Sequence, residues 1–154
     1  MRVISILFAF SLMGSLFFSS SCKKTEEAIV VPIMPEISAN IDGELWKADT
    51  FTVTKSGGIY TVSAIRGEQS IIMVIEDLKV GKYPFDITDN SAVYVTGSNV
   101  EDQYIGGVNG ELQVTAIIKS GKEFEGQFNF IGINNNARVK SITQGSIIDA
   151  TIPK

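Results

Sequence analysis

The sequence lacks histidine entirely and has one cysteine among its 154 residues. Without histidine there is no Ser-His or Cys-His catalytic pair, and no zinc site with imidazole ligands. Basic residues are also few, with 13 Lys and Arg against 17 Asp and Glu, whereas a nucleic-acid-binding protein needs a basic face. Neither a P-loop nor a G-x-G-x-x-G motif is present to bind a phosphate group. We therefore expect no nucleic-acid partner, no cofactor and no histidine-based catalysis.

The N-terminus has the three parts of a secretory signal. The positive charge of Arg2 precedes an uncharged and mostly apolar segment, residues 3–18, and small serines follow it. The apolar segment has 16 residues, fewer than the roughly 20 that a membrane-spanning helix requires. Residues 1–21 are therefore predicted to be a cleaved signal peptide.

Cys22 lies directly after this segment and follows Ser20 and Ser21. The arrangement resembles a bacterial lipoprotein signal, in which the cysteine is acylated and becomes the first residue of the mature protein. Ser19 stands where leucine is usual, so ordinary cleavage to a soluble periplasmic protein is the alternative. We predict lipidation of Cys22, with two or three acyl chains holding the protein in the outer membrane.

Residues 22–35 are expected to form the lipidated cysteine and an extended tether. Five polar residues, 23–27, precede an apolar stretch that contains Pro32 and Pro35, and proline restricts the chain to extended conformations. The charges at 23–27 also resemble the surface-export signals of Bacteroidota lipoproteins. A tether without such a signal would be equally polar, so a cell-surface and a periplasmic orientation both stay open.

Residues 36–154 have the composition of a single β-domain. The chain contains 21 Ile, 13 Val and 10 Thr, whose branched side chains pack well on a pleated sheet. We predict an all-β fold, an antiparallel β-sandwich of about nine or ten short strands. The alternative is a small up-and-down or calycin-like β-barrel.

Alternating apolar residues and turn signals place the strands. The expected strands are 37–41, 45–48, 51–53, 59–66, 71–75, 92–96, 112–118, 124–130, 138–143 and 146–152. Alternation is clearest at 124–130, and 112–118 should pair with it as a hairpin with Ala116 and Ile118 facing inward. The continuous apolar run 71–75 predicts a central strand covered on both faces. Residues 81–84 and 86–91 are expected to be the longest irregular connection.

Trp46 is the sole tryptophan and follows the Asp42-Gly43 turn. A lone tryptophan after a hairpin turn commonly closes the end of a β-core. It is also the candidate platform on which a ligand such as a sugar could stack.

Carboxylates offer weaker candidates for chemistry. Asp86, Asp89 and Asn90 supply oxygens that calcium prefers, but the EF-hand spacing is absent, so no metal site is predicted. The adjacent acids 76–77 and 101–102 would point to opposite faces of a strand rather than across a cleft. We predict no catalytic residues.

Three motifs suggest a family. Residues 39–48 read A-x-I-D-G-x-x-W-x-A, residues 126–130 read G-x-F-x-F, and residues 142–147 read I-T-x-G-x-hydrophobic. Together with the N-terminal signal they resemble the DUF6252 family of small Bacteroidota lipoproteins, over residues 37–148. Ile147 stands where that family frequently has an aromatic residue. The resemblance implies lipidation and a β-fold, and supplies no catalytic residues.

The sequence thus predicts a cell-envelope lipoprotein attached to the membrane through its N-terminal acyl chains. We expect a non-catalytic binding or structural accessory module with a glycan or an envelope protein as partner. The alternative is a glycan- or small-hydrophobic-ligand-binding protein of the outer membrane surface, with its site in a barrel mouth or around Trp46. A hydrolase that uses Asp or Glu alone is a further alternative.

Overall fold

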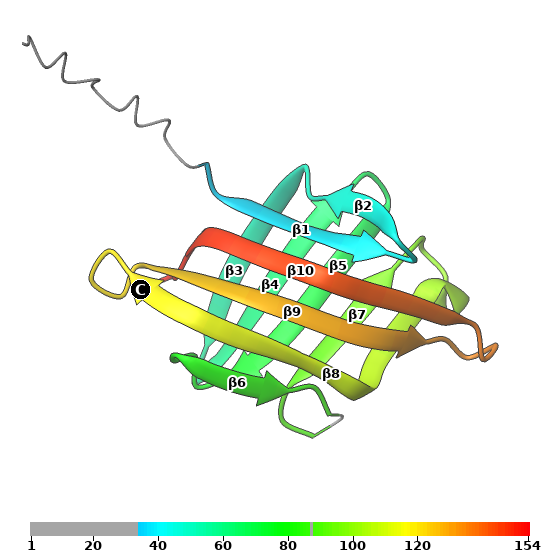
Figure 1. The fold of residues 1–154 in the computed structure, drawn as a ribbon. Coiled ribbons are helices and arrows are strands. Elements are labelled where there is room, and N and C mark those ends of the chain that lie inside the picture. Colours follow the sequence, from blue (N-terminus) through cyan, green and yellow to red (C-terminus); the bar gives the residue numbers. More distant parts are fainter. Residues whose placement is uncertain (1–33, 87) are drawn as a thin grey trace, which may run out of the picture. The chain divides into compact units, whose positions relative to one another are not determined.

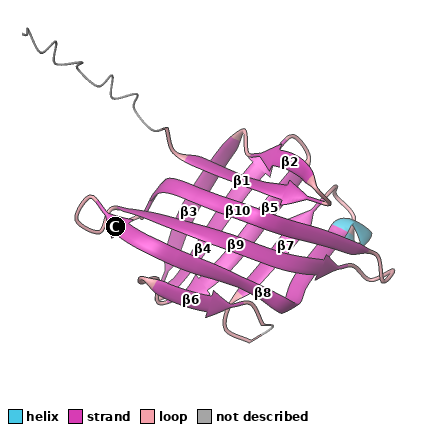
Figure 2. Cartoon of the chain, in the orientation of Figure 1, coloured by secondary structure: helices cyan, strands magenta, loops and turns pink. Residues whose placement is uncertain are grey.

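The computed structural model describes residues 34–86 and 88–154, which form one antiparallel sheet of ten strands (Figure 1). The strands are β1 (Glu36–Ile41), β2 (Glu44–Lys47), β3 (Thr50–Ser56), β4 (Ile59–Arg66), β5 (Gln69–Glu76), β6 (Gly81–Pro84), β7 (Ser91–Val95), β8 (Gln103–Ile118), β9 (Glu123–Ile133) and β10 (Val139–Thr151). Within the described residues, the helical element is the single 3-10 turn η1 (Val100–Asp102) (Figure 2). The predicted all-β class is confirmed.

The sheet curls into a half-barrel. Its strand order is β2-β1-β10-β9-β8-β7-β5-β4-β3, with β6 paired to β8 beside this path. Figure 1 shows β1, β10, β9 and β8 crossing in front of β3, β4, β5 and β7. The long strand β8 links the two layers, because its residues 103–106 pair with β7 of the rear layer while its residues 105–118 pair with β9 of the front layer. The order ends at β2 and β3, so pairing between described strands leaves the half-barrel open there.

The core fills the space between the two layers. Along β9 the predicted alternation is confirmed, since the side chains of Phe124, Phe128 and Phe130 are buried and their neighbours face outward. Other core residues come from every layer: Ile37, Ala39, Ile41, Trp46, Val62, Ala64, Ile71, Met73, Ile75, Tyr83, Phe85, Ala92, Tyr94, Tyr104, Leu112, Val114, Ile142, Ile147 and Ala150. One continuous core therefore holds the sheet in its curled form.

The sequence predictions for the segments 71–75 and 81–84 are wrong. The strand β5 is covered on one face only: Ile71, Met73 and Ile75 are fully buried, whereas the residues between them are half-buried on the outer face. The segment 81–84 is the strand β6 rather than an irregular connection. Pro84 is tolerated there because β6 lies at an edge and pairs with β8 alone.

The segments predicted as separate strands at 138–143 and 146–152 are one strand, β10, interrupted by two register shifts. Ile142, Ile147 and Ala150 all face the core, although strict alternation would put residues an odd number apart on opposite faces. The register shifts lie between these residues and coincide with positive φ at Gln144 and Asp149. The extra residues restore the inward face and bend the strand.

A register shift in β8 also corrects the predicted face of its C-terminal part. The shift lies between Val114 and Ala116. Ile117 consequently packs against the core, in place of the Ala116 and Ile118 pair that simple alternation predicted.

Glycines allow the bent strands to approach closely. A Cβ atom at Gly145 would lie 2.5 Å from the carbonyl oxygen of Phe128 and 2.5 Å from its ring carbon Cδ2. A Cβ atom at Gly132 would lie 2.7 Å from Cβ of Tyr104. Any side chain at these positions would push adjacent strands apart, so the absence of a Cβ is a packing requirement.

Replacing Gly145 tests this requirement. We expect Gly145→Ala to lower the free energy of unfolding by about 1–3 kcal/mol, because the methyl group overpacks the β9–β10 contact. The matched control is Gly58→Ala, where nothing lies within 4 Å of the added carbon and the change should stay within about 0.5 kcal/mol. Urea unfolding of both variants measures the difference. Equal stabilities for the two variants would contradict the packing argument.

Candidate functional site

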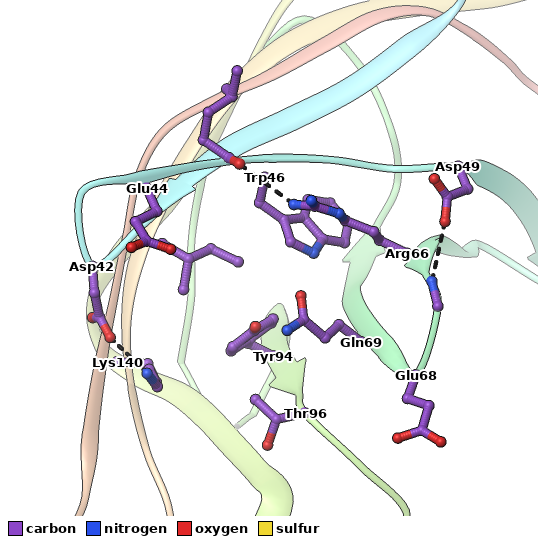
Figure 3. Close-up of a pocket in the computed structure, with 13 residues that line it drawn as sticks. Asp42, Glu44, Trp46, Asp49, Arg66, Glu68, Gln69, Tyr94, Thr96 and Lys140 are labelled. Atoms are coloured by element: carbon purple, nitrogen blue, oxygen red, sulfur yellow. Dashed lines mark hydrogen bonds and ion pairs between the residues drawn. The ribbon is translucent and has the colours of Figure 1, made fainter.

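A pocket of about 820 Å³ lies where the β1–β2 hairpin meets the β4–β5 turn, the end of β7 and the start of β10 (Figure 3). We call it the hairpin pocket. Six of its thirteen lining residues carry a charge, and the set is Ile41, Asp42, Glu44, Leu45, Trp46, Asp49, Arg66, Gly67, Glu68, Gln69, Tyr94, Thr96 and Lys140. A site of this size is in the usual range for small-molecule binding, about 300–1,000 Å³.

Trp46 supplies the aromatic ring of the β1–β2 hairpin, and this ring is buried. It is the inward-facing residue of β2 and is 2% exposed. Its indole Nε1 is buried and has no hydrogen-bond partner among the described residues. In Figure 3 the nitrogen edge of the indole faces the part of the pocket where Gln69 and Tyr94 lie. A buried donor without a partner costs about 1–3 kcal/mol.

The carboxylate of Glu123 is the other buried side-chain group without a hydrogen bond, and it is a different case. Its Oε2 lies 2.7 Å from Lys119 Nζ, so an ion pair compensates its charge. Among the described residues, the Trp46 N–H is therefore the buried side-chain donor with neither a hydrogen bond nor an ion pair.

Asp42 fixes one wall of the pocket. Its carboxylate accepts hydrogen bonds from Lys140 Nζ at 2.7 Å and from the Ser141 backbone N–H at 2.9 Å. The hydrogen bond from Lys140 is the largest cause that lowers the pKa of Asp42, and the bond from Ser141 is the next. The same Asp42–Lys140 bond raises the pKa of Lys140. The Asp42 backbone N–H also donates to Ser141 O. These bonds tie the β1–β2 turn, where Asp42 has a φ of 52°, to β10.

The β4–β5 turn forms the opposite wall. Asp49 accepts a hydrogen bond from the Gly67 backbone N–H at 3.1 Å and donates its own N–H to Ile65 O at 2.8 Å. Arg66 reaches from this turn to the edge strand β2, where Nη1 donates to Leu45 O over 3.4 Å. This single long bond leaves most of the guanidinium donors free of described partners. The Arg66 side chain can therefore move more readily than the Asp42 and Asp49 groups.

Tyr94 lies on β7 and is 3% exposed. Its ring centroid is 6.2 Å from that of Tyr104, in a tilted arrangement. Burial, with smaller contributions from Asp42 and Tyr104, raises the pKa of the Tyr94 hydroxyl. The hydroxyl makes no hydrogen bond with the described residues, but unlike the Trp46 N–H it is not fully covered. Its raised pKa keeps it protonated at neutral pH, so it is an available donor.

The hairpin pocket therefore offers both donors and acceptors. Trp46, Tyr94, Arg66 and Gln69 can donate hydrogen bonds, while Glu44 and Glu68 present carboxylates that no described residue binds. Among the described residues, no group of three Asp, Glu, His or Cys side chains is arranged to hold a metal ion. The arrangement is suited to binding a polar small molecule.

The predicted site residues have different outcomes. Cys22 lies outside the described residues. Trp46 does line the pocket, but its ring is packed away, and the stacking role stays a prediction. Asp86 stabilises its own loop. Its Oδ1 accepts hydrogen bonds from the backbone N–H groups of Asp89 and Thr88, each at 2.8 Å, and these bonds lower the pKa of Asp86.

Sequence reasoning missed most of the pocket. Asp42 was recognised only as a turn residue, and Arg66 and Lys140 were not singled out, whereas Tyr94 was considered only as one of four tyrosines that could widen a surface around Trp46. Lys140 is 98 residues from Asp42 in the sequence, and no local pattern indicates that β10 lies beside β1. The pairing of these strands is the missing information.

The fold and the pocket together define an all-β half-barrel with a polar site beside its N-terminal hairpin. A family model for a domain of unknown function, DUF6252, matches residues 34–151. The chain belongs to this family, which confirms the resemblance drawn from its motifs. No curated protein matches the chain. No solved structure matches it either. Across the residues that the structure describes, no helix has the length and apolar character needed to cross a bilayer.

The Asp42–Lys140 pair gives a pH-dependent prediction. The pKa of Asp42 is lowered on folding, so its ionised form stabilises the protein fully above the ordinary value of 3.8 and progressively less as the pH falls through the lower folded value. We expect Asp42→Asn to be less stable than the wild type at pH 7, by about 1 kcal/mol or less because the pair is partly exposed. The difference should close as the pH falls from 4 to 2.

Urea unfolding at several pH values measures this effect. Asparagine keeps the oxygen that accepts from Ser141, so the variant removes the charge of Asp42 and its bond from Lys140 but leaves the Ser141 bond in place. The control is Glu76→Gln, which removes an exposed carboxylate outside the pocket and should change stability little at any pH. A difference between Asp42→Asn and wild type that is constant with pH would contradict the assignment.

Proposed function

We propose that this protein is a lipid-anchored cell-envelope protein whose β-domain is a non-catalytic binding module, with the hairpin pocket as its site. The observation that carries the proposal is the Trp46 N–H, a buried donor that faces the pocket and finds no partner in the described protein. Buried polar groups in folded proteins are almost always satisfied. A ligand oxygen in the hairpin pocket would satisfy this one.

The sequence supports the lipid anchor. The apolar segment 3–18, the small residues before Cys22 and the polar residues after it follow the order of a bacterial lipoprotein signal. Residues 23–154 have 12 basic and 17 acidic residues, after Arg2 is removed from the 13 basic residues of the chain. This net negative charge is not attracted to anionic headgroups, so attachment depends on the acyl chains.

The chemistry of the pocket favours binding over catalysis. A carboxylic acid that donates a proton near neutral pH needs a raised pKa, whereas the pKa of Asp42 is lowered by Lys140 and Ser141. Asp49 is engaged with the backbone of Gly67. Two of the four pocket carboxylates thus hold the walls together rather than face a substrate as acids.

Cys22→Ala tests the anchor. We expect the variant to move from the membrane pellet to the soluble fraction, because removal of the thiol removes the site of acylation. The control is Ser21→Ala, which keeps a small residue before the cysteine and should stay with the membrane. Cell fractionation followed by intact-mass measurement reads both results. A Cys22→Ala protein that sediments with membranes as the wild type does would remove the lipoprotein part of the proposal.

Blocking the pocket tests the binding module. Leu45 lines the pocket and is 72% exposed, so Leu45→Trp adds bulk at the entrance without disturbing the core. Val80→Trp is the matched control, since Val80 is 60% exposed and does not line the pocket. In a thermal-shift screen of glycans, lipids, carboxylates and amines, a ligand should raise Tm for wild type and Val80→Trp but not for Leu45→Trp. Melting curves that no compound shifts would count against the module.

A further inference from the structure

The polar groups of the hairpin pocket restrict what kind of ligand it can hold. Formal charges on the lining residues are four negative and two positive, a net charge of −2. Asp42 is paired with Lys140, and Asp49 is bonded to Gly67 N–H. Of the other charged or polar groups that line the pocket, the carboxylates of Glu44 and Glu68 can only accept hydrogen bonds. The Trp46 indole N–H and the Arg66 guanidinium can only donate them.

Three ligand classes fit this arrangement poorly. An anion would satisfy the donors but would lie in a pocket of net negative charge, near the unpaired Glu44 and Glu68. A cationic amine would satisfy these carboxylates, but it offers no acceptor to the Trp46 N–H and is repelled by Arg66. An apolar ligand would leave both donors and acceptors without partners. Each class matches only part of the lining.

Hydroxyl groups match all of it, because each donates one hydrogen bond and accepts others. We infer that the hairpin pocket binds a neutral saccharide, with a sugar oxygen accepting the Trp46 N–H and sugar hydroxyls donating to Glu44 or Glu68. This inference rests on the proposed binding function and deepens it by naming the ligand class. The volume of about 820 Å³ accommodates a short oligosaccharide.

The contact with Trp46 uses the nitrogen edge of the indole rather than the ring face. The ring is 2% exposed, and Nε1 itself is covered. A ligand therefore reaches Nε1 only when a covering side chain moves. Among the charged lining side chains, Arg66 is weakly held, because one bond of 3.4 Å joins it to Leu45 O. Gln69 lies beside the same edge in Figure 3 and can both donate to and accept from a sugar hydroxyl.

Isothermal titration of the full-length protein, in a detergent without a sugar headgroup, tests the inference. The probes are maltotriose, cellotriose, mannotriose and xylotriose, with trigalacturonate as the anionic arm and spermidine as the cationic arm. We expect a neutral trisaccharide to bind, and binding to change the fluorescence of Trp46, the sole tryptophan. Each sugar is offered free and linked to a lipid in vesicles; binding to either form supports the inference and identifies the source.

Two variants locate the contact. Trp46→Phe removes the N–H and Gln69→Leu removes the amide, and each should weaken binding of the trisaccharide about tenfold, equivalent to one lost hydrogen bond. The control Gln103→Leu changes an exposed amide of β8 outside the pocket and should bind as the wild type does. Because Gln69 is outside the buried core, its variant gives a result even where Trp46→Phe unfolds. Unchanged affinity in Gln69→Leu and in a folded Trp46→Phe overturns the inference.

The remaining outcomes separate this inference from the proposed function. If trigalacturonate or spermidine binds, Leu45→Trp abolishes that binding and no neutral sugar binds, the ligand class is wrong and the binding module stands. If no probe binds and the wider thermal-shift screen is also flat, both are wrong.

Discussion

The close approach of strand glycines to neighbouring strands is the constraint on which the half-barrel depends. At Gly145 and Gly132 the space that a Cβ would need is taken by Phe128 and Tyr104. The strands β8, β9 and β10 can therefore lie close together while register shifts bend them across the second layer. The bend encloses the aromatic core and brings the start of β10 beside the β1–β2 turn. Without it the two walls of the hairpin pocket would not face each other.

The pocket combines rigid walls with unpaired groups. Asp42 is bonded to Lys140 and Ser141, and Asp49 is bonded to the β4–β5 turn. These bonds hold the walls without using the Trp46 N–H. A site whose donors are positioned by the fold loses little conformational freedom when a ligand arrives, which favours affinity. Arg66 is the exception, since one long hydrogen bond holds its guanidinium. Its side chain can therefore change position when a ligand binds.

Most strands could be predicted from the sequence because alternation and turn residues are local signals. The pattern around Phe124 to Phe130 indicates a half-buried strand, and Asp42-Gly43 indicates the first hairpin. Register shifts could not be predicted, since an extra residue in β10 exchanges inward and outward positions without any change in composition. The same limit applied to the site. Trp46 stood out as a single residue, but Lys140 joins the pocket only through the pairing of β1 with β10.

Trp46 itself connects stability to the proposed binding function. The buried ring contributes apolar packing at the end of the core, which phenylalanine would also contribute without placing an unpaired donor inside the protein. For stability alone, the indole N–H is therefore a disadvantage. Sequences depart from such local rules mainly where function requires it. Because the N–H faces a pocket rather than the core, an acceptor that enters the pocket can recover this cost, and the proposed ligand oxygen is such an acceptor.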